Sequence, residues 1–138
     1  MSAKDIYHNV VKTALEKDGW NITADPLIMK FGEVDLFIDL GAEKVISAEK
    51  NGEKIAVEIK SFVGTSLVSE YHSALGQFIN YKIVLQEMEP DRTLYVAITK
   101  KVYQRFLNYS FFSFSIKKNN LYIIVFDPTK EEIIQWIK

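Results

Sequence analysis

The sequence predicts an α/β fold, a sandwich of helices around a mixed β-sheet, and three observations support this class. Asn51-Gly52 separates two strand-like runs, residues 42–50 and 53–62, and this dipeptide between strands is typical of a tight hairpin. Apolar residues recur at helical spacing through residues 69–88. Strand-like and helical stretches then alternate downstream, an order that favours helices packed on a sheet.

The other elements are predicted from local pattern. Residues 3–18 are expected to form an amphipathic helix that ends at Gly19, after a Ser2–Asp5 start resembling a capping box. The stretch from Leu27 to Leu40 is predicted to be extended, with a break near Gly32. Further along, the pattern predicts a strand at 93–99, a short helix at 100–108 and a strand at 121–126. The tail 131–138 fits a helix by its spacing and a strand by its β-branched content.

Composition limits the classes of function. The 138 residues predict one domain, 1–138, and the net charge of −1 argues against strong nonspecific binding to nucleic acid. The absence of cysteine excludes disulfides and thiolate metal sites. The sequence contains no run of about 18 apolar residues, so we expect no membrane association and a cytoplasmic location.

The second strand of the hairpin carries the most informative side chains. Because side chains alternate along a strand, Glu58 and Lys60 share one face while the isoleucines beside them share the other. Charged groups in an otherwise apolar strand are costly to bury unless they are paired or bind something. A cross-strand ladder of salt bridges is one explanation. A metal-dependent phosphodiesterase site, built from acids and a lysine on neighbouring strands, is the other.

Two further features favour the second explanation. Asp39 precedes Glu58 by nineteen positions, on the strand that leads into the hairpin. Gln77 and Tyr81 lie one helical turn apart on the following helix, so they share a face. Asp39 and Glu58 would be hard oxygen ligands suited to Mg²⁺ or Mn²⁺. Asp35 has the same parity as Asp39, and alternation does not separate the two.

These residues resemble a known group of enzymes. Asp39, Glu58-x-Lys60 and Gln77-x-x-x-Tyr81 resemble the PD-(D/E)xK nuclease superfamily, in the variant found in RecB-type nucleases and Holliday-junction resolvases, with Ile38 in place of the usual proline. The whole chain is similar to the XisH-like excision controlling factors of cyanobacteria. That closer resemblance rests on residues 38–44, 57–62 and 76–81.

The resemblance implies a fold and a set of roles. The fold would be a restriction endonuclease-like three-layer sandwich. A Mg²⁺ or Mn²⁺ ion would be held by Asp39, Glu58 and the carbonyl of Ile59. Lys60 would orient the attacking water or stabilise negative charge, and Gln77 would hold Lys60 or the phosphate. Supporting contacts could come from Asp5, His8 and Tyr81.

The resemblance also implies partners. XisH-like factors are associated with excision of a DNA element, the fdxN element, that interrupts a nitrogen-fixation gene, alongside a site-specific recombinase and a second small factor, XisI. We therefore expect DNA and an XisI-like protein as partners. The near-neutral charge and the aromatic-rich second half independently suggest a complex, which could instead be a homodimer. Three functions stay open: a DNA endonuclease, a noncatalytic recombination accessory, and a nuclease controlled by a small partner. The aromatic stretch between Tyr103 and Phe114 is expected to form core or protein interface rather than a base-stacking platform.

Overall fold

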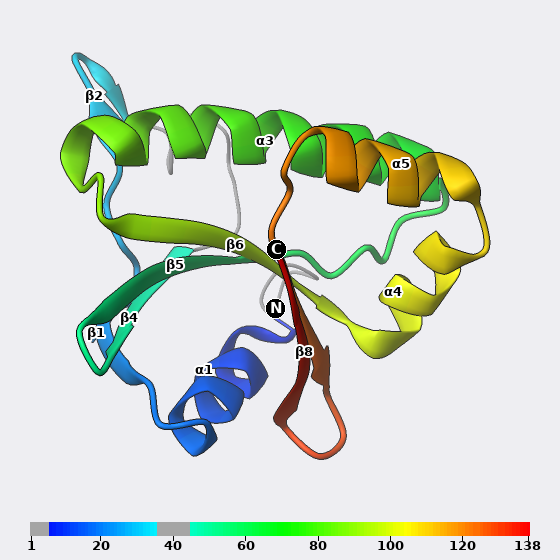
Figure 1. The fold of residues 1–138 in the computed structure, drawn as a ribbon, viewed down its shortest axis with the longest axis horizontal. Coiled ribbons are helices and arrows are strands. Elements are labelled where there is room, and N and C mark those ends of the chain that lie inside the picture. The colour runs from blue at the N-terminus through cyan, green and yellow to red at the C-terminus, as the bar shows by residue number, and fades with distance from the viewer. Residues whose placement is uncertain (1–5, 36–44) are drawn as a thin grey trace.

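The computed structural model describes residues 6–35 and 45–138, and a mixed six-stranded sheet forms its centre (Figure 1). The strand order is β1-β4-β5-β6-β7-β8, with β5–β6 and β6–β7 parallel and the other pairs antiparallel. The strands are β1 (Asn21–Ala24), β4 (Val45–Lys50), β5 (Glu53–Ile59), β6 (Arg92–Thr99), β7 (Ile123–Asp127) and β8 (Glu132–Ile137).

Helices cover both faces of this sheet. The long helix α3 (Leu67–Met88) lies along one face, together with α4 (Lys100–Leu107) and α5 (Ser110–Lys118), whereas α1 (His8–Lys17) lies across the other (Figure 1). Each interface has its own apolar core, with Phe78 and Phe106 in the first and Leu15 and Ile59 in the second. The arrangement confirms the predicted three-layer α/β sandwich.

The predicted hairpin is present. Asn51 and Gly52 both have positive φ, 52° and 83°, the backbone that a two-residue type I′ turn requires. The turn fixes the register, with Lys50 opposite Glu53 and Val45 opposite Glu58. Strand β5 ends at Ile59, three residues earlier than predicted, and Phe62 adopts φ 52°, which is incompatible with an extended strand.

The other predicted elements agree with the structure to within a few residues. Helix α3 begins two residues early because the Ser66 side chain accepts a hydrogen bond from the Ser69 N–H at 3.1 Å. Helix α1 ends just before Gly19, whose φ of 92° suits a C-cap glycine. The structure starts that helix at His8, after a turn at Ile6 and Tyr7, which is later than predicted; residues 3–5 of the prediction lie outside the described residues. No helix in the described part of the chain is long and apolar enough to cross a membrane.

Four segments differ from the sequence prediction or complete it. Strand β1 was not predicted, and its four residues are too few to show a period. Residues 110–118 form helix α5, although their serines and phenylalanines have weak helix propensity, because Phe112 and Ile116 are buried on one side. The ambiguous tail is a strand, β8, paired with β7. The predicted break at Gly32 is the turn of a small hairpin, β2 (Lys30–Phe31) and β3 (Val34–Asp35).

Asp127 anchors the turn between β7 and β8 and provides a pH-dependent test of the fold. Its carboxylate accepts hydrogen bonds from Lys100 Nζ at 3.0 Å and from the Thr129 and Lys130 N–H groups at 2.9 and 3.2 Å. The hydrogen bond from Lys100 is the main reason that the pKa of Asp127 lies below its ordinary value. Its stabilising effect is therefore complete above the ordinary carboxyl pKa of about 4 and is lost as pH falls through the lower folded value.

We expect Asp127→Asn to melt below the wild type at neutral pH, with a difference that shrinks as the buffer is taken from about pH 5 toward pH 2. Thermal melts of both proteins across that range measure it. A difference that stays constant with pH would show that the charge of Asp127 contributes nothing.

Candidate functional site

Glu58 lies inside the layer between the sheet and α3. Its neighbours across the strands are Val45 on β4 and Val96 on β6, and both belong to the apolar core beneath α3. The Glu58 side chain is fully buried, with 0% of its surface exposed. Ile55, Val57 and Ile59 face the opposite core, as the alternation predicted. The structure thus places a carboxylate among apolar side chains at the centre of the sheet, where burial of charge is costly.

Lys60 follows on the same face, at the point where β5 ends. Its backbone N–H donates to the Ala97 carbonyl at 3.0 Å, which continues the pairing with β6 by one residue. The half-buried Lys60 lines a small depression of about 80 Å³ together with Ser61, Phe62, Glu70 and Ser73. A lysine that lines a polar depression, two residues from a buried carboxylate, is suited to hold an anion such as a phosphate.

Helix α3 supplies the other wall of this depression. Glu70, Ser73 and Gln77 follow one another at helical spacing, so they form one row along the helix. Gln77 Oε1 is buried and accepts no hydrogen bond from the described part of the chain. Tyr81 lies one turn further on, 1% exposed, in the core against the sheet. The structure therefore brings Glu58, Lys60, Gln77 and Tyr81 into the same layer.

The loop after Lys60 is held at two points that the sequence did not reveal. Phe62 packs edge-on against Phe106 of α4, with ring centroids 5.3 Å apart. The Glu70 carboxylate accepts a hydrogen bond from the Gly64 N–H at 2.9 Å. A Cβ added at Gly64 would lie 2.9 Å from the Glu70 carboxyl carbon, so a larger residue there would push the carboxylate aside. Glu70 has no sequence signal of its own, since its partner is a backbone group six residues away.

His8, which could add a ligand or a supporting contact or be an exposed helix charge, contacts an aspartate outside the candidate site. Its Nε2 lies 2.8 Å from Asp25 Oδ1, and Lys12 Nζ lies 2.8 Å from the other oxygen of the same carboxylate. Partial burial acts to raise the pKa of Asp25, but the hydrogen bonds from Lys12 and His8 outweigh it and the pKa is lowered. His8 is thus part of an ion-pair cluster between α1 and the segment after β1.

Asp39 and Asp35 both stay open as the first acidic ligand. Asp39 and Asp5 lie outside the described residues, and Asp35 is placed only by its backbone, opposite Lys30 in the β2–β3 hairpin. Within residues 6–35 and 45–138, no three His, Asp or Glu side chains lie close enough together to hold a metal ion. The described residues supply one suitable carboxylate, Glu58, so a metal site here needs a further donor from elsewhere in the chain.

Comparison with known proteins settles the family. The model of the XisH protein family matches residues 1–134. The chain belongs to the XisH family. A crystal structure of an XisH family protein from Nostoc punctiforme is 47% identical, covers 97% of this chain and 100% of its own, and superposes with a TM-score of 0.89. A fdxN element excision controlling factor protein from Anabaena variabilis is 48% identical, with 97% and 99% coverage and a TM-score of 0.89. No curated protein matches the chain.

The resemblance seen in the sequence is therefore confirmed at the level of the XisH family. The two solved relatives come from Nostoc and Anabaena, which implies a cyanobacterial source for the family members compared. The assignment to a nuclease superfamily rests on the residues of the site and is treated as a proposal below.

Proposed function

We propose that this XisH protein controls excision of a DNA element and does so by metal-dependent cleavage or nicking of DNA. The observation that carries the proposal is the buried Glu58 followed by Lys60, on the face of the sheet that α3 covers with Gln77. Glu58 lies between two core valines, so it is not one of the solvated charges that line exposed strands and turns. Family membership and the name of the Anabaena relative support the link to excision.

Each residue has a chemical task in this proposal. Glu58, with Asp39 and the Ile59 carbonyl, would hold Mg²⁺ or Mn²⁺, which supplies an activated water and polarises the phosphate. The Lys60 ammonium binds the scissile phosphate at the mouth of the depression and stabilises the charge that develops there. Gln77, whose buried amide oxygen accepts no hydrogen bond from the described residues, would accept one from Lys60 in the metal- and DNA-bound state and so fix the direction of the ammonium.

A second function is favoured by charge. The chain has a net charge of −1, so it lacks the basic footprint on which DNA-binding proteins depend for affinity. This supports an accessory protein that retains the fold and acts through an XisI-like partner, or a nuclease that cuts only in that complex. The recombinase that performs excision would act in the same pathway.

The test is nicking of supercoiled plasmid DNA with Mg²⁺ or Mn²⁺, by the protein alone and with an XisI-like protein added. We expect conversion to the open circle that EDTA abolishes, and Lys60→Ala should lower its rate by about 10²–10³-fold, as for loss of a group that stabilises transition-state charge.

Lys54→Ala is the matched control, because Lys54 lies on the same strand but pairs with Asp91 at the surface, 3.4 Å away. Its nicking rate should equal that of the wild type. An equal loss of nicking rate in both variants would show that the effect comes from removing any positive charge on the strand. No nicking under any condition would favour the accessory function.

A further inference from the structure

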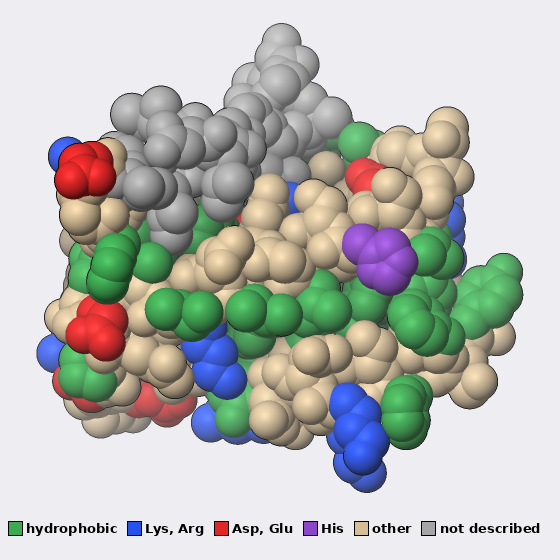
Figure 2. Space-filling model, turned by 90° about the horizontal axis from the view of Figure 1, so that it is seen from above, with side chains coloured by type: hydrophobic (Ala, Val, Ile, Leu, Met, Phe, Trp, Pro, Cys, Tyr) green, Lys and Arg blue, Asp and Glu red, His purple; other side chains and the backbone are tan. Residues whose placement is uncertain are grey.

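The outer surface of α3 carries an apolar face that the monomer leaves uncovered. Val68, Ile79 and Ile83 on α3 are 47%, 41% and 53% exposed, and Phe111 on the adjoining α5 is 49% exposed. The ring of Phe111 packs against the ring of His72 on α3, with the two centroids 6.4 Å apart. Figure 2 shows hydrophobic side chains following one another across this side of the molecule. We call these four residues the α3–α5 face; a continuous exposed patch of this kind is typical of a protein interface.

Gly76 is the second observation, and it is independent of exposure. It lies near the middle of a 22-residue helix, where glycine costs about 1 kcal/mol relative to alanine. A Cβ at this position would meet nothing within 4 Å in the described part of the chain, and φ is not positive there. The described fold therefore gives no reason for glycine at 76. A glycine inside a helix usually has a packing or functional reason, and close approach of another helix is one such reason.

The position of Gly76 on the helix connects the two observations. Residues three, four and seven apart are neighbours on a helical surface, so Gly76 is bordered by His72, Ile79 and Ile83. It forms a notch beside the apolar face, midway along a helix of about 33 Å. A notch at the midpoint is where two copies of the same helix would cross if a two-fold axis passed through it.

We propose that the α3–α5 face binds a second copy of this chain, with the two α3 helices antiparallel and crossing at Gly76. A two-fold axis at Gly76 sets each residue opposite the one equally far on the other side. Ile83 of one copy then lies opposite Ser69 of the other and beside Val68. The end of each α3 that carries Ile83 then packs against the end of the other α3 that adjoins Phe111. The face is therefore complementary to itself.

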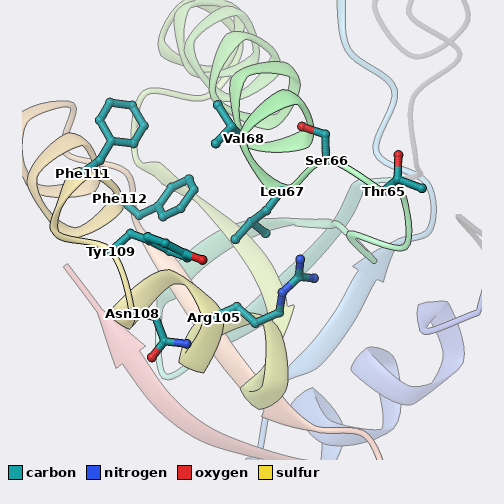
Figure 3. Close-up of a pocket in the computed structure, with 9 residues that line it drawn as sticks. All are labelled: Thr65, Ser66, Leu67, Val68, Arg105, Asn108, Tyr109, Phe111 and Phe112. Carbon is teal, nitrogen blue, oxygen red and sulfur yellow. The ribbon is translucent and has the colours of Figure 1, made fainter.

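A groove already exists where the partner's Ile83 would enter. It has a volume of about 730 Å³ and lies between the start of α3 and the α4–α5 connection, with Leu67, Val68 and Phe111 among its lining residues (Figure 3). Tyr109, 59% exposed, and Phe112 continue its aromatic wall (Figure 3). An aliphatic side chain inserted into an aromatic-lined pocket is the kind of anchor that dominates binding energy at interfaces.

Charge at the crossing favours two copies of one chain over a charged partner. The residues around Gly76, namely His72, Ser73, Ile79 and Asn80, include no Lys, Arg, Asp or Glu, so two identical surfaces meet there without like-charged pairs of those residues. Lys82, the nearest cation on the helix, has its ammonium 5.9 Å from the rings of Phe78 and Tyr122. Helix faces of this length together with α5 suit the roughly 1,000 Å² that a specific interface needs.

The dimer leaves the candidate site open. Gln77 and Ile79 are two residues apart, so their side chains are separated by a rotation of about 200° about the helix axis. The apolar face and the Lys60 depression thus lie on opposite flanks of α3, and DNA could reach both sites of the dimer.

Sedimentation velocity of the purified chain tests the proposal. We expect a species of twice the 15.9 kDa chain mass. Ile79→Glu should convert it to monomer without loss of helical circular dichroism, whereas Ile134→Glu, at a 52% exposed position on β8, should leave the dimer intact. A monomeric wild type at about 100 μM, or equal effects of the two variants, would overturn the proposal.

The absence of cysteine allows a test of the crossing point itself. A residue at a two-fold axis lies beside its own copy, so Gly76→Cys should oxidise to a disulfide-linked dimer within the range of Cα distances that a disulfide spans. Ile134→Cys should cross-link no faster than free thiols in solution. Rapid cross-linking at 134 with none at 76 would place the dimer axis elsewhere and refute the α3 crossing.

Discussion

Glu58→Ala is expected to abolish Mg²⁺-dependent nicking while the protein stays folded. The variant removes the fully buried carboxylate of β5 that faces α3, and with it the ligand proposed to hold the metal. Loss of the metal removes both the activated water and the polarised phosphate, so the rate should fall below detection. Glu58→Gln, which keeps the shape of the side chain, should be equally inactive, because the amide is a far weaker ligand for Mg²⁺.

The stability of these variants separates a functional carboxylate from a structural one. A carboxylate buried among valines carries a desolvation penalty, and a second carboxylate brought close to it would add repulsion when no cation is present. We expect Glu58→Ala and Glu58→Gln to melt at or above the wild-type temperature without metal. Wild type alone should gain stability when Mg²⁺ is added. A clear fall in melting temperature for both variants would show that Glu58 serves a structural salt bridge.

Phe106→Ala is expected to cause the largest loss of stability. Phe106 is 2% exposed, and its ring lies between those of Phe62, Tyr71 and Phe112, at centroid distances of 5.3, 5.7 and 4.9 Å. Truncating a buried phenylalanine costs about 3–5 kcal/mol, through lost burial and the cavity left behind. For a chain of this size the melting temperature should fall by roughly 10–20 °C.

The same variant should weaken the candidate site indirectly. Phe62 follows Lys60 by two residues and is held by Phe106, so its release frees the loop that forms the depression. Phe31→Ala, on the β2 strand and 57% exposed, is the control and should change the melting temperature little. Denaturant unfolding of the two variants measures the difference. Equal stability of Phe106→Ala and Phe31→Ala would contradict the packing described for α4.

The sequence predicted the parts of the fold whose signals are local. The Asn51-Gly52 turn fixes its own hairpin through two positive φ angles, and that hairpin determines which face Glu58 takes. Helix α3 was predicted because its period extends over 22 residues and Pro90 follows it. From these two elements alone, the meeting of Glu58, Lys60 and Gln77 between sheet and helix could be anticipated.

What the sequence did not show depends on contacts between distant residues. Helix α5 forms because Phe112 packs on Tyr71 and Phe106. This tertiary contact stabilises a segment of weak helix formers, and it is not visible in the local sequence. The Glu70 carboxylate accepts a hydrogen bond from the Gly64 backbone. His8 contacts Asp25, which directly follows a strand that the sequence did not predict. The choice between Asp35 and Asp39 stays a prediction, because Asp39 lies outside the described residues.

Crystals of the wild type soaked in Mn²⁺ provide the most direct test of a metal-dependent site. Anomalous scattering locates manganese without reference to any assumed mechanism. We predict a peak within roughly 2.0–2.6 Å of a Glu58 carboxylate oxygen, with a second carboxylate, that of Asp39 or Asp35, at a similar distance. Glu58→Gln crystals under the same soak should lack the peak. Manganese bound only elsewhere, or no manganese at Glu58 in the wild type, would contradict the assignment of this site.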